Sequence, residues 1–242
     1  MDKASEETRI KDFQREIHQK IEERAQETGL VDSETKPIYD GVADIPGYVA
    51  TKPKIMWVLK EAWGIVDEKT GKIKGDYTDI WECWTEKGFN TPTWLPMLYI
   101  LYGLRVGQGK IKYNDMPKAN MEMVNLLKQT AYINVSKIPG EKKSGNMSKK
   151  YEFWMDIIRA QIEGYNPDVI IFGGTFDTMK RSFIAPRTKP ISKTPTQEIA
   201  HFYKDEKGRL LVNAMHPAQR HISWDFYVDE IVDRIRELHL KK

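Results

Sequence analysis

The sequence predicts an α/β fold, in which helices cover both faces of a central, mainly parallel four-stranded sheet in a three-layer α/β/α arrangement. Four short apolar runs have the length of buried strands. Segments of helical length separate these runs, and alternating strands and helices are typical of parallel sheets. We therefore expect a single domain over residues 1–242, with an N-terminal helical extension over about residues 1–30.

The predicted elements begin with an amphipathic N-terminal helix. Its apolar residues recur at spacings of three and four, at Ile10, Phe13, Ile17 and Ile21. Ser5 is a candidate N-cap for this helix, and Gly29 is a candidate stop. Residues 31–53 contain several prolines and glycines, which predicts an irregular connection to the first strand.

The remaining elements alternate along the chain. The predicted strands cover residues 55–59, 131–135, 169–172 and 210–214. The predicted helices cover residues 94–102, 116–129, 151–162, 175–183 and 224–240. A turn at Asp205-Glu206-Lys207-Gly208 is typical of a hairpin, so residues 198–203 can add an antiparallel strand.

Composition narrows the class of protein. No apolar run is long enough to cross a membrane and the N-terminus is charged, so we expect a cytoplasmic protein without a membrane partner. The single cysteine, Cys83, excludes an intramolecular disulfide and a four-cysteine zinc or iron–sulfur site. We expect a monomer that uses no metal and no organic cofactor.

The charge of the chain is nearly balanced, with 38 basic and 35 acidic residues. This mild excess does not by itself indicate nucleic-acid binding. Basic residues are nevertheless concentrated in two segments: Lys137, Lys142, Lys143, Lys149 and Lys150 in one, and Lys180, Arg181, Arg187, Lys189 and Lys193 in the other. Each segment either follows a phosphate backbone or is ordinary solvated loop charge.

Polar residues that follow the predicted strands mark the expected site, because ligands of open parallel sheets bind at the carboxyl ends of the strands. Two segments, Val58-Leu59-Lys60-Glu61-Ala62-Trp63-Gly64 and Asn213-Ala214-Met215-His216-Pro217-Ala218, are similar to strand-end motifs of the uracil-DNA glycosylase superfamily. Residues 132–140 and 168–176 resemble the two intervening strands of that superfamily, in the same order. The chain is therefore identified as a divergent member without an iron–sulfur cluster.

The resemblance implies a DNA glycosylase that hydrolyses the N-glycosidic bond of uracil or another deaminated base in single- or double-stranded DNA. It implies that His216 donates a hydrogen bond to the base and that Glu61 positions water and supports the cationic sugar. Asn134 would pair with uracil, and Trp63 or Tyr77 would stack on the flipped base. The expected DNA contacts are Lys137, Lys142, Lys143, Gln219 and Arg220.

Each of these roles has a structural alternative. His216 can instead bond to backbone at a strand end, Asn134 can cap a turn, and Glu61 can lie on a solvated surface. The aromatic residues can be part of the core, and Arg220 can simply precede the C-terminal helix.

Three substitutions depart from the motifs of the superfamily. Lys60 stands at a glycine position, Trp63 at a proline position and Ala218 at a serine position. The alternative function is therefore a catalytically weak or silent nucleic-acid-binding module with the same fold. An unrelated flavodoxin-like enzyme is disfavoured, because Gly173-Gly174-Thr175 lacks the spacing of a phosphate-binding loop.

Overall fold

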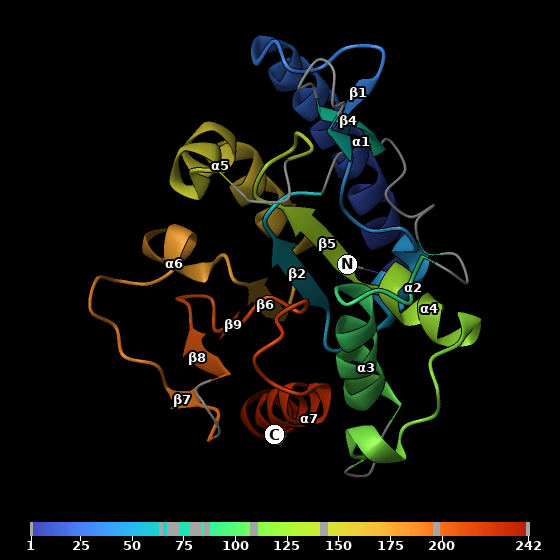
Figure 1. Ribbon diagram of the computed structural model, residues 1–242, viewed down its shortest axis with the longest axis vertical. Coiled ribbons are helices and arrows are strands. Elements are labelled where there is room, and N and C mark those ends of the chain that lie inside the picture. The colour runs from blue at the N-terminus through green and yellow to red at the C-terminus, as the bar shows by residue number, and fades with distance from the viewer. Residues whose placement is uncertain are drawn as a thin grey trace.

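A computed structural model describes residues 2–62, 65–66, 73–77, 84, 88–106, 111–140, 145–195 and 199–240. The described strands form a six-stranded sheet in the order β5-β2-β6-β9-β8-β7 (Figure 1). A separate three-stranded sheet has the order β1-β4-β3, formed by residues 35–38, 73–77 and 65–66. The strands of the larger sheet are β2 (Ile55–Leu59), β5 (Ala131–Asn134), β6 (Val169–Gly173), β7 (Ser192–Lys193), β8 (Ala200–Lys204) and β9 (Leu210–Ala214).

The four predicted strands are confirmed, and they form the parallel part of the larger sheet, β5-β2-β6-β9. The prediction of a four-stranded sheet was wrong, because β8 and β7 extend the sheet on the β9 side in antiparallel orientation. Of these two strands, β8 confirms the antiparallel strand expected at residues 198–203, whereas β7 was not predicted. The turn at residues 205–208 returns the chain for this pairing. Its Gly208 has φ +78° and donates a hydrogen bond to the Asp205 carbonyl at 3.0 Å, a backbone conformation that favours glycine.

Helices cover both faces of the sheet, and the strands are apolar on both sides for this reason. Along β2, Ile55, Trp57 and Leu59 belong to a core shared with α3 (Trp94–Arg105) and α7 (Trp224–Ile235). The alternate residues Met56 and Val58 belong to a second core, shared with α1 (Lys3–Glu27) and α5 (Met147–Tyr165). Figure 1 shows the two helical layers on opposite sides of the strands.

The N-terminal helix α1 (Lys3–Glu27) is confirmed, and its Ile10, Ile17 and Ile21 are buried in the second core. The predicted cap was wrong. Asp2 is the N-cap, and its carboxylate accepts a hydrogen bond from the Ser5 N–H at 2.9 Å. The helix therefore packs, together with α5, on one face of the larger sheet.

Helix α5 (Met147–Tyr165) is longer than predicted at both ends. Gly164 does not end it, because the left-handed residue that terminates the helix is Asn166, with φ +47°. Gly164 instead permits close contact with α1. A Cβ atom at this position would lie 2.3 Å from Cζ of Phe13.

The other described helices are α2 (Ile45–Ala50), α4 (Met121–Lys128) and α6 (Phe176–Met179). Helix α2 and β1 (Thr35–Ile38) were not predicted, since residues 31–53 were interpreted as an irregular connection. No element was predicted at β3 (Ile65–Val66) and β4 (Ile73–Tyr77), which complete the small sheet. In the described part of the chain, no helix combines the length and apolar character needed to cross a bilayer.

Candidate functional site

The carboxyl ends of β2, β6 and β9 meet at a topological switch point. From β2 the chain continues to β5 on one side and then crosses to β6 on the other side. In open α/β sheets such a reversal leaves a crevice where ligands bind. The residues that follow the three strands are Lys60 and Glu61, Gly174 and Thr175, and Met215 and His216.

Gly174 lies between two of these strand ends. It is exposed and has φ +71°, which favours glycine. A Cβ atom at this position would lie 3.6 Å from Cβ of His216 and 3.9 Å from Cε of Lys60. The backbone is anchored, because the Gly174 N–H donates to the Ala214 carbonyl at 2.9 Å. The fold therefore brings Lys60 and His216 to either side of one glycine.

The orientation of the His216 ring follows from its local hydrogen bonds. Its Nδ1 accepts a hydrogen bond from the Ala218 N–H at 3.1 Å. Burial, helped by the nearby charge of Lys60, lowers the pKa of His216 to about 4. The ring is therefore neutral at neutral pH and carries its proton on Nε2. Here the motif histidine presents an uncharged hydrogen-bond donor.

Glu61 contacts the loop after β5 and helix α5. Its side chain is only 2% exposed, and Oε1 accepts from Nζ of Lys150 at 3.0 Å. The carboxylate lies against Gly140, where a Cβ atom would approach Oε1 to 2.6 Å. The other oxygen, Oε2, is buried and has no hydrogen-bond partner among the described residues.

Asn134, the expected base-reading residue, is fully buried at the end of β5. Its Oδ1 accepts from the Tyr132 hydroxyl at 3.0 Å. Its backbone N–H and its Nδ2 both donate to Oδ2 of Asp40, at 2.5 and 3.3 Å. The carboxamide is thus engaged inside the protein in this arrangement.

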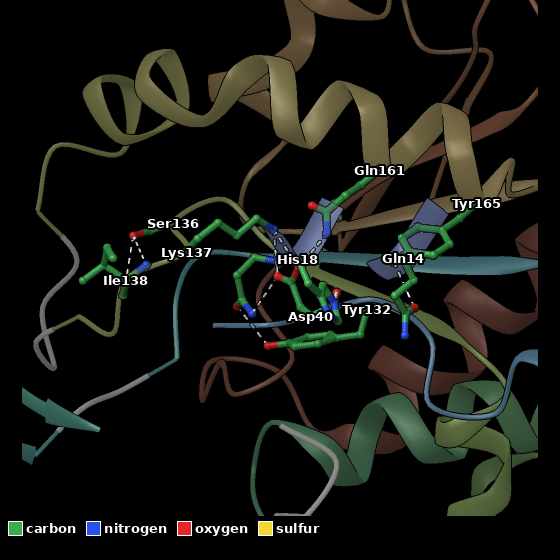
Figure 2. Close-up of polar contacts among 10 residues, drawn as sticks. Gln14, His18, Asp40, Tyr132, Ser136, Lys137, Ile138, Gln161 and Tyr165 are labelled. Atoms are coloured by element: carbon green, nitrogen blue, oxygen red, sulfur yellow. Dashed lines mark hydrogen bonds and ion pairs between the residues drawn. The ribbon is translucent and has the colours of Figure 1, made fainter. Parts of the chain in front are cut away.

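Lys137 was expected to contact DNA, but its side chain is 0% exposed and lies in the same interior cluster. Its Nζ is 2.8 Å from both carboxylate oxygens of Asp40 (Figure 2). The expected phosphate contact is therefore replaced by a buried ion pair, since Asp40 compensates the charge that burial would otherwise leave unpaired. Burial lowers the pKa of the Lys137 ammonium, while Asp40 opposes that shift.

Asp40 is the centre of this cluster, and side chains from two further elements also contact it. Gln161 of α5 donates to Oδ1 at 2.7 Å, and the His18 ring of α1 lies 2.9 Å from the Asp40 carbonyl. Figure 2 shows these side chains pointing toward Asp40. Sequence reasoning missed Asp40, because nothing in residues 31–53 distinguishes a buried carboxylate from a loop aspartate.

The loop after His216 is organised by Gln219. Its Oε1 accepts from the N–H groups of His221 and Ile222 at 2.8 Å, and its Nε2 donates to the Ile222 carbonyl at 2.9 Å. Gln219 therefore closes its own turn in this conformation. Arg220 is exposed beside it.

The remaining expected site residues are Tyr77, Trp63, Lys142 and Lys143. Tyr77 ends β4 and pairs with Ile38 of β1 in the small sheet. Trp63, Lys142 and Lys143 lie outside the described residues. Among the residues that are described, no three His, Cys, Asp or Glu side chains cluster as metal ligands.

The structure thus places His216 near Lys60, pairs Glu61 with Lys150, and bonds both Asn134 and Lys137 to Asp40. No hydrogen bond between described residues links Glu61, Asn134 and His216 to one another. Neither the protein-family models nor the curated proteins compared with this sequence match it.

Proposed function

We propose that this protein is a uracil-DNA glycosylase-like hydrolase that removes uracil or another deaminated base from DNA. The observation that carries the proposal is the state of His216. It is a neutral imidazole at the carboxyl end of β9, beside the switch point, and its Nε2–H has no partner among the described residues. A fixed neutral donor favours base departure, because its hydrogen bond strengthens as negative charge develops on the base.

In the proposed reaction, a water oxygen bonds to C1′ of the sugar as the C1′–N bond breaks. The electron pair of that bond leaves with the base, whose carbonyl oxygen accepts from His216. Glu61 would receive the proton of the attacking water through Oε2, which has no partner among the described residues and which the turn after β2 would have to uncover, since it is buried. Lys150 would orient the carboxylate through Oε1.

A neighbouring cavity supports nucleic acid as the substrate. It has a volume of about 480 Å³ and lies between the loop after β5 and the start of α5. Phe153 lines it and is 40% exposed, and Lys149 and Lys150 line it as well. Exposed aromatic rings beside lysines suit nucleic acid, because bases stack on the ring while the ammonium groups contact phosphates.

The base-reading role of Asn134 stays a prediction. To pair with uracil, its carboxamide would have to release the Nδ2 contact to Asp40, which is long at 3.3 Å. The burial of Asn134 favours a second candidate function, a catalytically silent nucleic-acid-binding module, because a buried amide cannot contact a base without rearrangement.

The two candidate functions are distinguished by incubating the protein with oligonucleotides that carry uracil, hypoxanthine or xanthine, as single strands and as duplexes. Alkaline cleavage at abasic sites then reports base removal. We expect strand breaks with the wild type and a loss of at least about 100-fold in His216→Gln, as for removal of an oxyanion donor. His221→Gln, in the same loop and exposed, is the matched control and should retain activity.

Absence of breaks on every substrate, with salt-sensitive binding retained, would favour the silent module. Equal activity in His216→Gln and the wild type would overturn the assignment of His216.

A further inference from the structure

Lys60 has an unusual position for a lysine. Its side chain is half-buried, and in the described part of the chain its ammonium forms no ion pair or hydrogen bond. Its backbone is fixed, because the Lys60 carbonyl accepts from the Ser136 N–H at 2.9 Å. The ammonium is not among the buried polar atoms that lack a partner, so a ligand can reach it from solvent.

The Lys60 side chain shares the space over Gly174 with His216. Its Cε would lie 3.9 Å from a Cβ at position 174, and Cβ of His216 would lie 3.6 Å from the same point. Like Lys60 Nζ, His216 Nε2 has no hydrogen-bond partner among the described residues. Gly174 itself is exposed, so the surface above it, which Lys60 and His216 border, is open to solvent.

We propose that Lys60 Nζ and His216 Nε2 together bind one anionic oxygen above Gly174, and that this oxygen is the carbonyl oxygen of the departing base. This inference rests on the proposed glycosylase function. Both donors suit that oxygen, because it gains charge as the C1′–N bond breaks, and a fixed cation stabilises the charge without proton transfer. The lysine would thus add a cation where the resemblance implies only a neutral donor.

An oxyanion at this position could also belong to a phosphate, so the test uses three small probes. Barbiturate is an anionic pyrimidine with carbonyl oxygens, uracil is its neutral counterpart, and inorganic phosphate represents the nucleic-acid backbone. Binding is followed on the full chain by NMR of ¹⁵N-labelled histidine. The signal of His216 is assigned by its loss in His216→Gln.

We expect barbiturate to shift the His216 Nε2 resonance more strongly than uracil or phosphate. Lys60→Met should weaken barbiturate binding by about tenfold or more, as for loss of a charge-assisted hydrogen bond. Lys60→Arg, which keeps the charge, should retain most of the affinity. Lys60→Met should also raise the pKa of His216, because the Lys60 charge helps to lower it.

Equal barbiturate affinity in the wild type and in Lys60→Met would overturn the inference. Preference for phosphate over barbiturate would overturn the base assignment. Urea unfolding of each variant verifies that the fold is intact.

Single-turnover excision separates this inference from the proposed function. Lys60→Met should slow base release by about tenfold or more while binding of an uncleavable oligonucleotide is unchanged. If the wild type and Lys60→Met excise the base at the same rate, the role of Lys60 is overturned and the proposed function is not. Barbiturate binding between Lys60 and His216 without any base excision would overturn the proposed function alone.

Discussion

The Nζ atom of Lys137 lies 2.8 Å from both carboxylate oxygens of Asp40, a residue 97 positions earlier in the chain, and both side chains are fully buried. The pair connects the loop after β5 to the segment between β1 and α2. Because Gln161 and Asn134 also donate to the Asp40 carboxylate, the charge of Asp40 is compensated from several elements.

Removing one partner of this pair should destabilise the protein strongly. We expect Lys137→Met to lower the free energy of unfolding by about 3–5 kcal/mol, because it leaves a buried carboxylate without its cation. The double variant Asp40→Asn/Lys137→Met should lose much less than the sum of the single variants. Urea denaturation measures both, with the exposed Lys149→Met as control, within about 0.5 kcal/mol of wild type. A Lys137→Met protein with wild-type stability and weakened DNA binding would contradict the buried pair.

The pH dependence of stability should report the neutral state of His216. Its pKa in the folded protein, about 4, lies below the unfolded value of about 6.5. The stabilisation of the folded protein by the neutral His216 ring is therefore complete above about pH 6.5 and is lost as the pH falls toward 4.

When the pH is lowered from about 7.5 to about 5, the free energy of unfolding of the wild type should fall by at most about 2 kcal/mol more than that of His216→Gln. The pKa of His18 is also lowered by burial, but His18 is present in both proteins and its effect cancels. Parallel stability curves for the two proteins, measured by urea unfolding at each pH, would show that His216 is not buried as described.

The pairing of Glu61 with Lys150 should be visible in stability. We expect Lys150→Met to cost about 1–3 kcal/mol, because it removes the hydrogen-bond donor to a carboxylate that is only 2% exposed. Adding Glu61→Gln should recover part of that loss, since the remaining group is then uncharged. Lys149→Met, one residue earlier and exposed, is the control for both proteins. If Lys150→Met and Lys149→Met unfold at the same urea concentration, the pairing contributes nothing.

The contact between α1 and α5 depends on Gly164. Alanine is favoured over glycine inside a helix by about 1 kcal/mol, but its Cβ would lie 2.3 Å from the Phe13 ring. That ring also packs edge-on against Tyr165, with centroids 5.3 Å apart, so it cannot move freely. We expect Gly164→Ala to destabilise the protein by about 1–2 kcal/mol net, because overpacking outweighs helix propensity.

Thermal unfolding checks this prediction. Gly145→Ala is the control, since the nearest atom to its added Cβ would be Lys150 Cε at 4.0 Å. A Gly164→Ala protein that is more stable than the wild type would mean that the two helices are less closely packed than described.

The parallel strands could be predicted because each one is buried on both faces, which requires a continuous apolar run such as Ile55–Leu59. The edge strand β7 could not, since its two residues, Ser192 and Lys193, carry no apolar pattern and are defined only by pairing with β8. Helix boundaries such as that at Gly164 also failed, because a neighbouring helix determined the role of the glycine.

The sequence by itself determined that polar residues follow the strand ends, at Lys60, Glu61, Asn134 and His216. Only the tertiary structure decided which of these residues meet. It places Lys60 beside His216 and turns Asn134 and Lys137 inward to Asp40. The reason is physical: strand position follows from local apolar pattern, whereas the partner of a charged or polar side chain depends on which distant segment the fold brings within hydrogen-bonding distance.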